Sequence, residues 1–234
     1  MTNVAEKSTV QSASFGEHEI VEHIYDAVIE QQLRPGTKLS ELSLCEAFGV
    51  GRMRIRSALL LLASRNIVDL QSNRGAYIST PTLEQARQVF EARRAIEPNI
   101  CRLAVERATE NQIVSLEDHL EDERNAQTKG DRRQAIRLSG RFHVMLAEIA
   151  VNQVMERMVK ELVTRTSLII GMFGASGTAN CHEDEHSLLL QAFKEGRQDE
   201  AAQLMVTHLN HIEQQIDLTS DRRESVDLVE LFKN

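Results

Sequence analysis

The stretch from Ser40 to Ser64 limits the possible folds of this chain more than any other. Ser40 can cap a helix whose apolar positions are Leu42, Leu44, Ala47 and Phe48. Gly49-Val50-Gly51 then turns the chain, and a second helical pattern from Arg52 to Ser64 has Ile55, Leu59, Leu60 and Leu62 on its apolar positions. Two short helices joined by a tight glycine turn predict a helix-turn-helix unit.

The flanking residues extend this unit to a winged helix-turn-helix domain over residues 18–80. A helix is expected over residues 18–33, and Arg34-Pro35-Gly36 ends it, since Pro lacks an N–H and Gly tolerates positive φ. After the second short helix, residues 66–71 and 76–79 favour strands, and Ser72-Asn73-Arg74-Gly75 has the chemistry of a hairpin turn. Three helices and a β-hairpin form a winged helix.

The rest of the chain is predicted to be helical. Helices are expected near residues 82–108, 110–129, 131–150, 152–174, 181–196 and 199–217. The fold class is therefore mainly α, with the winged helix-turn-helix followed by an all-α antiparallel helical bundle over residues 81–219. Residues 1–17 are expected to be a disordered tail, and residues 220–234 are expected to be a second tail.

Composition favours a cytoplasmic protein. Hydrophobic residues make up 41% of the chain, but none of the apolar runs approaches the roughly 20 residues that span a bilayer. The first residues resemble no signal peptide, so no membrane partner is expected. The three cysteines, Cys45, Cys101 and Cys181, are far apart and odd in number, which fits a reducing compartment.

The net charge of −8 conceals a basic segment. Between Arg34 and Arg74 the chain has seven basic and three acidic residues, a local net charge of +4. Screening limits phosphate attraction to about 8 Å at physiological salt, so a local patch decides nucleic-acid binding more than the total charge does.

Side chains of the second short helix and of the wing are predicted to contact DNA. Donors on the first turns of a recognition helix reach the acceptors of guanine in the major groove. The candidates on the helix are Arg52, Met53, Arg54 and Arg56, those at the wing are Arg74 and Gly75, and Lys38 precedes the helix-turn-helix. The alternative is that the three arginines only form a solvated helix face.

These residues resemble the DNA-binding domain of the GntR family of transcriptional regulators. The resemblance rests on Leu39-Ser40-Glu41, on Phe48 to Leu59, and on Asn73-Arg74-Gly75-Ala76-Tyr77-Ile78. The usual family run is Gly-Val-Ser-Arg-Thr-Pro-Val-Arg-x-Ala-Leu, and this chain keeps both arginines as Arg52 and Arg56. It departs at Gly51, Met53 and Arg54, so its operator sequence is not carried over from relatives.

The C-terminal half resembles the helical ligand-binding domain of the FadR-type branch, often called FCD. The matching pieces are Arg93-x-x-Ile96-Glu97, Phe142-His143, Asn152, Glu185-His186 and His208-Leu209. The resemblance implies that His143, His186 and His208 hold a divalent metal such as zinc, or one like nickel or manganese. In the family an Asp four residues before the first His usually joins them, but here Ser139 stands there, and a hydroxyl is a poor ligand beside a carboxylate.

Other interpretations of the histidines and arginines in the C-terminal half stay open. The three histidines can instead hydrogen-bond an anionic effector directly, and His182, His211 and Cys181 compete as ligands, with both of these histidines expected to face solvent. Effector-binding candidates are Arg93, Ser139 and Arg165, because an arginine can bind a carboxylate with two hydrogen bonds. The alternative for Arg93 is an ion pair with Glu97 one turn later.

The expected function is a transcriptional regulator, most simply a repressor, which binds a pseudo-palindromic operator as a homodimer and responds to a small carboxylate effector. One alternative is a metalloenzyme with a three-histidine zinc site. The sequence shows no partnered general base for such an enzyme, and this alternative gives the winged helix no role. A helical adaptor that only dimerises leaves the basic hairpin unit unexplained.

Overall fold

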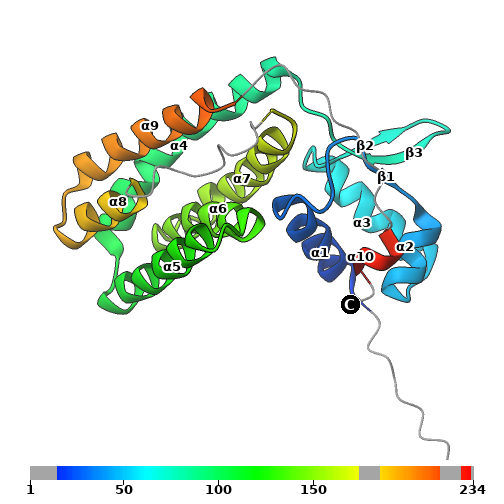
Figure 1. Ribbon diagram of the computed structural model, residues 1–234, viewed down its shortest axis with the longest axis horizontal. Helices are drawn as coiled ribbons and strands as arrows, with labels where there is room; N and C mark the ends of the chain where they lie inside the picture. Colours follow the sequence, from blue (N-terminus) through cyan, green and yellow to red (C-terminus); the bar gives the residue numbers. More distant parts are fainter. Residues whose placement is uncertain (1–14, 174–184, 217–227, 233–234) are drawn as a thin grey trace, which may run out of the picture.

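A computed structural model describes residues 15–173, 185–216 and 228–232 of the chain (Figure 1). Its first lobe contains α1 (Glu17–Ile29), β1 (Lys38–Leu39), α2 (Glu41–Phe48), α3 (Arg52–Ser64), β2 (Val68–Gln71) and β3 (Gly75–Ile78). Its second lobe contains α4 (Leu83–Arg107), α5 (Glu110–Thr128), α6 (Arg132–Ile149), α7 (Gln153–Phe173), α8 (Glu185–Lys194) and α9 (Gln198–Gln214). The mainly α fold class predicted from the sequence is confirmed.

The first lobe is the predicted winged helix with one more strand. Its sheet has the order β1-β3-β2, and both pairings are antiparallel. The hairpin register places Val68 opposite Ile78 and Gln71 opposite Gly75. β1 has only two residues, too few for a periodic sequence pattern, and its pairing of Lys38 with Tyr77 depends on a contact distant in sequence.

The core of this lobe is made from one face of each helix. Buried apolar residues of α1, α2, α3 and the hairpin form one cluster, which includes Ile20, Ile24, Leu44, Phe48, Ile55, Leu59, Leu62 and Ile78. Two residues assigned to these faces from the sequence are exposed, Leu42 by 67% and Leu60 by 61%. In α3 the buried stripe follows Ile55, Ala58, Leu59 and Leu62, and Leu60 lies about 100° from Leu59 around the helix.

The second lobe is built around long paired helices. Thr82 and Thr109 cap α4 and α5 through capping boxes, and the Asn152 side chain accepts hydrogen bonds from Val154 and Met155 at the start of α7. α4 packs along α9, and α6 packs between α5 and α7. A continuous core cluster joins α4 to α9, with Phe142, Leu146, Phe193 and Met205 among its members.

Helix α7 links the two lobes physically. Leu168, near its C-terminal end, is 2% exposed and belongs to the core cluster of the winged helix. Gly171 approaches Pro35 and Gln31, since a Cβ added there would lie 3.6 Å from Pro35 Cδ. α1 of the winged helix also packs against α6 and α7 (Figure 1).

The tail expected over residues 220–234 contains a short helix, α10 (Leu228–Phe232). The Phe232 ring lies 4.9 Å from the Phe48 ring, and α10 packs against α2. Apolar contact with a distant helix stabilises a segment that is too short to be helical on its own. The structure describes residues 15 and 16 of the expected N-terminal tail, and Phe15 also packs on Phe48.

None of the helices in the described ranges is long and apolar enough to cross a membrane.

The two glycines of the helix-turn-helix have different backbone conformations, so serine is expected to change stability in opposite directions at the two positions. Gly51 caps α3 at φ −75° and ψ 156°, which any residue adopts, whereas Gly49 ends α2 at φ 62°. Gly51→Ser should stabilise the fold by about 0.5–1 kcal/mol, because the hydroxyl caps α3 and the unfolded chain loses freedom. Gly49→Ser should destabilise it by about 1 kcal/mol, because a side chain is strained in the left-handed region.

Urea denaturation of both variants measures these free energies of unfolding. Shifts of the two midpoints in the same direction would contradict the assigned roles of the two glycines.

Candidate functional sites: a recognition helix and a buried histidine centre

The N-terminal turns of α3 present the predicted recognition residues to solvent. Arg52, Met53, Arg54 and Arg56 are all exposed, while Ile55 between them is 1% exposed and anchors the helix to the core. Gly51 stands where the family commonly has Ser, and it caps the helix without a side-chain hydrogen bond. The helix end that would enter a major groove therefore carries three guanidinium groups.

Two of these arginines have intramolecular partners. Arg56 Nε lies 3.0 Å from both carboxylate oxygens of Glu41 on α2, and this contact raises the pKa of Arg56. Arg54 Nη1 donates to the carbonyl of Phe15 at 2.9 Å. The Glu41 carboxylate holds the Arg56 guanidinium beside the turn, so the side chain is oriented before any DNA binds.

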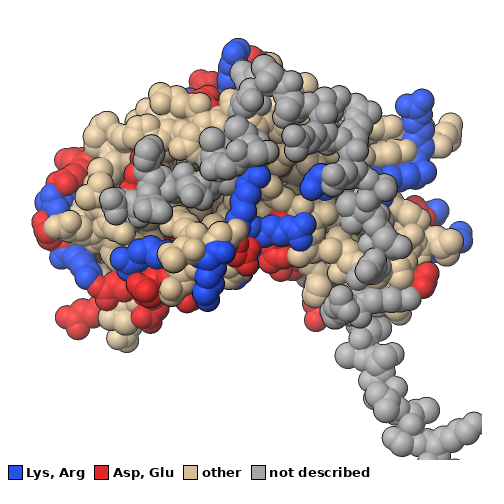
Figure 2. Space-filling view, viewed as in Figure 1, with Lys and Arg blue, Asp and Glu red and all other residues tan. Residues whose placement is uncertain are grey.

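The wing and β1 supply the remaining predicted contacts. Arg74 lies at the turn between β2 and β3, Gly75 follows at φ 100°, and both are exposed. Lys38 is exposed on β1. Figure 2 shows basic side chains projecting from the edge where the hairpin lies in Figure 1, while acidic and basic side chains alternate over the helical lobe.

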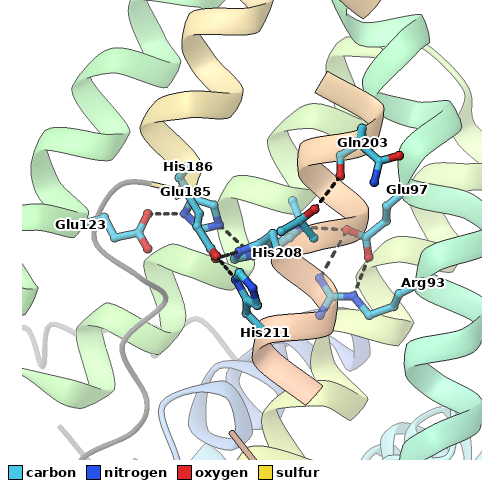
Figure 3. A network of polar contacts seen from close by, with 10 residues as sticks. Arg93, Glu97, Glu123, Glu185, His186, Gln203, His208 and His211 are labelled. Carbon is cyan, nitrogen blue, oxygen red and sulfur yellow. Dashed lines mark hydrogen bonds and ion pairs between the residues drawn. The ribbon is translucent and has the colours of Figure 1, made fainter. Parts of the chain in front are cut away.

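The second site lies inside the helical lobe, where three histidines meet (Figure 3). His143 on α6, His186 on α8 and His208 on α9 are each at most 4% exposed. Their Nε2 atoms converge: His186 and His208 are 3.1 Å apart, and His208 and His143 are 3.2 Å apart at these atoms. The structure therefore brings together the three residues that the resemblance implies as metal ligands.

Each of these imidazoles is hydrogen-bonded at its Nδ1 atom to a glutamate. His143 Nδ1 lies 2.7 Å from Glu97 Oε2, and His186 Nδ1 lies 2.9 Å from Glu123 Oε2. His208 Nδ1 lies 2.7 Å from Glu185 Oε2. An ionised carboxylate only accepts hydrogen bonds, so each Nδ1 must carry the proton that it donates.

This tautomer leaves a lone pair on each Nε2, and the three lone pairs face one another. Neutral imidazoles in this state have no proton to share at 3.1–3.2 Å, so they repel one another unless a cation lies between them. Nitrogens bound about 2.0–2.1 Å from a tetrahedral zinc are about 3.3 Å apart. The donor set therefore fits a divalent transition metal in chemistry and in spacing.

Burial keeps His143 and His208 neutral. It lowers the pKa of His143 to about 4, against the opposing effect of Glu97, and lowers the pKa of His208 to about 3. Burial alone would raise the pKa of Glu97, but the charge of Arg93 and the hydrogen bonds from His143 and Arg93 outweigh it and hold that pKa below its usual range. At neutral pH His143 and His208 are thus neutral imidazoles, and Glu97 is an ionised carboxylate.

Arg93 forms the ion pair with Glu97 that the sequence analysis gave as the alternative to effector binding. Its Nε lies 2.5 Å from Glu97 Oε1, and its Nη1 donates to Thr166 Oγ1 of α7 at 3.2 Å. The side chain is 2% exposed. Arg93 therefore supports the glutamate behind His143, and a chain of hydrogen bonds runs from the histidine centre to α7.

The other predicted effector residues lie apart from each other. Ser139 is half-buried on α6, one turn before His143. Arg165 pairs with Glu161 and lines a cavity of about 100 Å³ at the junction with the winged helix, together with Asp69 and Ser79. Arg165 immediately precedes Thr166, so the two side chains lie about 100° apart around α7 and only Thr166 contacts Arg93.

The structure describes one of the three alternative metal ligands, His211. Cys181 and His182 lie outside the described residues. His211, expected to face solvent, has a side chain that is 39% exposed, and its Nδ1 contacts the Glu185 carboxylate that also holds His208. This contact leaves His211 beside the centre and outside the converging set.

The supporting glutamates were missed in the sequence, although one signal for them exists. Glu123 occupies the apolar stripe of α5 after Leu116 and Leu120 and is 2% exposed, and a charged residue at a core position needs a buried partner. Glu97 and Glu185 were visible only as members of the resembling motifs, because the partners that make them functional lie on other helices.

Comparison with known families identifies both domains. The model of bacterial regulatory proteins of the gntR family matches residues 17–78, and the model of the FCD domain matches residues 88–211. The chain belongs to the GntR family and carries an FCD domain. It is a DNA-binding transcriptional regulator and not an enzyme, which decides against the metalloenzyme alternative.

Individual relatives agree with the family assignment. The chain is 26% identical over 190 residues to the transcriptional repressor RspR of Escherichia coli, covering 81% of this chain and 83% of that protein. It is 24% identical over 204 residues to the transcriptional regulator LutR of Bacillus subtilis, covering 78% and 92%. Escherichia coli McbR/YncC has a similar fold, with a TM-score of 0.76 and 21% identity over 83% of this chain and 93% of that one.

The recognition helix leads to a prediction for DNA binding. Arg52→Ala and Arg56→Ala should each weaken specific binding to the regulator's operator by at least about tenfold, because each removes a guanidinium from the base-reading turns. Gel-shift titration at about 150 mM salt with competitor DNA measures the effect. Arg133→Ala, which removes an exposed arginine of α6, is the matched control.

Equal affinity of Arg52→Ala, Arg56→Ala and the control would show that α3 does not read the operator.

Proposed function

We propose that this regulator binds a pseudo-palindromic operator as a homodimer, and that a small organic carboxylate controls it through a divalent metal held by His143, His186 and His208. The exposed arginines of α3 and the wing residues Arg74 and Gly75 support the DNA-binding part. Two recognition helices about 34 Å apart match adjacent major grooves, which supports a two-fold arrangement of two chains. The likeness to RspR, which is named a repressor, supports repression as the outcome.

The observation that carries the metal proposal is the convergence of three unprotonated Nε2 atoms whose Nδ1 atoms are fixed by glutamates. Ligating histidines typically donate their other N–H to a carboxylate, which fixes the ring and raises its basicity. Zinc fits this donor set, and nickel or manganese is an alternative. Such a metal would supply a Lewis-acidic centre to which a carboxylate can bind.

The local charge balance also favours a divalent cation. With neutral imidazoles, Glu97, Glu123 and Glu185 contribute three negative charges and Arg93 contributes one positive charge, a net charge of −2 in a largely buried region. Uncompensated buried charge is strongly destabilising. A cation of charge +2 at the Nε2 atoms brings the total to zero.

Three protein ligands leave coordination positions free for an effector. Ser139 stands one turn before His143, so no carboxylate of the protein takes the position that the family usually gives to Asp. In this proposal a carboxylate from a small organic acid takes that position, and the Ser139 hydroxyl hydrogen-bonds it. Arg93 assists indirectly, since its guanidinium is engaged with Glu97 and Thr166.

Helix α7 is the proposed route from this centre to the DNA-binding domain. Thr166 contacts the Arg93–Glu97–His143 chain, and Leu168, two residues later, lies in the core of the winged helix. A shift of α7 would change the Thr166 contact and the Leu168 packing together. For the effector to control DNA binding, it must bind the two arrangements of the domains with different affinity.

Metal analysis tests the centre directly. Purified regulator incubated with zinc and desalted should retain about one zinc per chain, whereas His186→Ala should lose it, because two histidines and no carboxylate remain. Glu123→Gln should weaken zinc affinity by about 10–100-fold, since the amide holds the His186 ring less strongly than a carboxylate does. His18→Ala is the matched control, because His18 is an exposed histidine of α1 in the other lobe.

Equal zinc content in His186→Ala and His18→Ala would refute the metal centre while leaving the DNA-binding proposal intact.

A further inference from the structure

A cavity of about 680 Å³ lies between the DNA-binding domain and the helical domain. One wall is α1, with Glu22, Tyr25 and Asp26, and the opposite walls are α6 and α7. This volume falls in the range of about 300–1,000 Å³ typical of small-molecule sites. The cavity shares none of its lining residues with the histidine centre.

The cavity has an uneven charge distribution. Its lining includes five basic side chains and three acidic ones, and four of the basic groups, Arg137, Arg141, Arg157 and Lys160, belong to α6 and α7. Arg141 and Lys160 have glutamate partners, Glu148 and Glu156. Arg157 is exposed and lines the cavity, and within the described ranges it makes no ion pair, so its guanidinium is available to an anion.

The rest of the lining offers an apolar surface beside this cationic rim. Val144, Val154, Met158 and Val163 come from α6 and α7, and Tyr25 comes from α1. Val154 and Met158 are 56% and 48% exposed, a high exposure for such residues in a hollow between domains. Tyr25 is 8% exposed, and this burial raises the pKa of its hydroxyl.

We infer that this cavity is a second ligand site, which takes an organic anion with an apolar body. The anionic group binds Arg157 at the rim, and the apolar body lies on Val154, Met158 and Val163. The lining belongs to both domains, so a bound anion contacts α1 of the winged helix and α7 of the sensor together. Its binding therefore favours one arrangement of the two domains.

The probe for this site is 8-anilinonaphthalene-1-sulfonate, an aromatic anion whose fluorescence rises in apolar surroundings. Full-length regulator should bind one probe molecule per chain in a saturable titration. Arg157→Glu should weaken this binding by about tenfold or more, because it replaces a charge-assisted contact with repulsion. Val154→Asp should weaken it similarly, because it places a charge on the apolar surface.

Two matched variants separate this site from general probe binding. Arg133→Glu reverses an exposed arginine of α6 outside the cavity, and Val114→Asp alters an apolar residue of α5 that is 52% exposed. Both should bind the probe as the natural chain does. Equal losses in Arg157→Glu and Arg133→Glu, or in Val154→Asp and Val114→Asp, would overturn the inference.

Discussion

The structure of the helical domain depends on one constraint: three buried histidines must donate their Nδ1 protons to three glutamates. This requirement fixes the tautomer of His143, His186 and His208 and turns their Nε2 lone pairs toward one point. The helices that carry these groups are α4, α5, α6, α8 and α9, so nearly the whole domain is arranged around the centre. Removing a glutamate would free a ring, and removing a cation would leave three lone pairs in mutual repulsion.

The same network connects the sensor to the DNA-binding domain. Glu97 accepts from His143 and from Arg93, and Arg93 reaches Thr166 on α7. Leu168 of that helix is part of the winged-helix core, and Gly171 lies against the loop that follows α1. Both domains therefore contact α7, and the arginines of α3 belong to a lobe that packs on the helical domain through this helix. The cavity beside α1 lies at this same junction.

Sequence periodicity predicted the helices well because each buries a regular apolar stripe, and the glycine turns around Gly49 and Gly75 have local conformational causes. The histidines were found through a family resemblance and not through spacing, since they lie on three helices. Glu123 was missed because its partner, His186, is 63 residues away. The position of Arg165 and the packing of α10 on Phe48 also depend on contacts between distant segments, which helical periodicity does not encode.

The most direct measurement is the X-ray absorption spectrum of the regulator loaded with one equivalent of zinc. The account predicts three imidazole nitrogens at about 2.0–2.1 Å, with the remaining positions filled by oxygen from water or a carboxylate. It also predicts that His208→Ala lowers the number of imidazole ligands to two. A zinc environment with fewer than three imidazoles in the natural chain, or one unchanged by His208→Ala, would contradict the account.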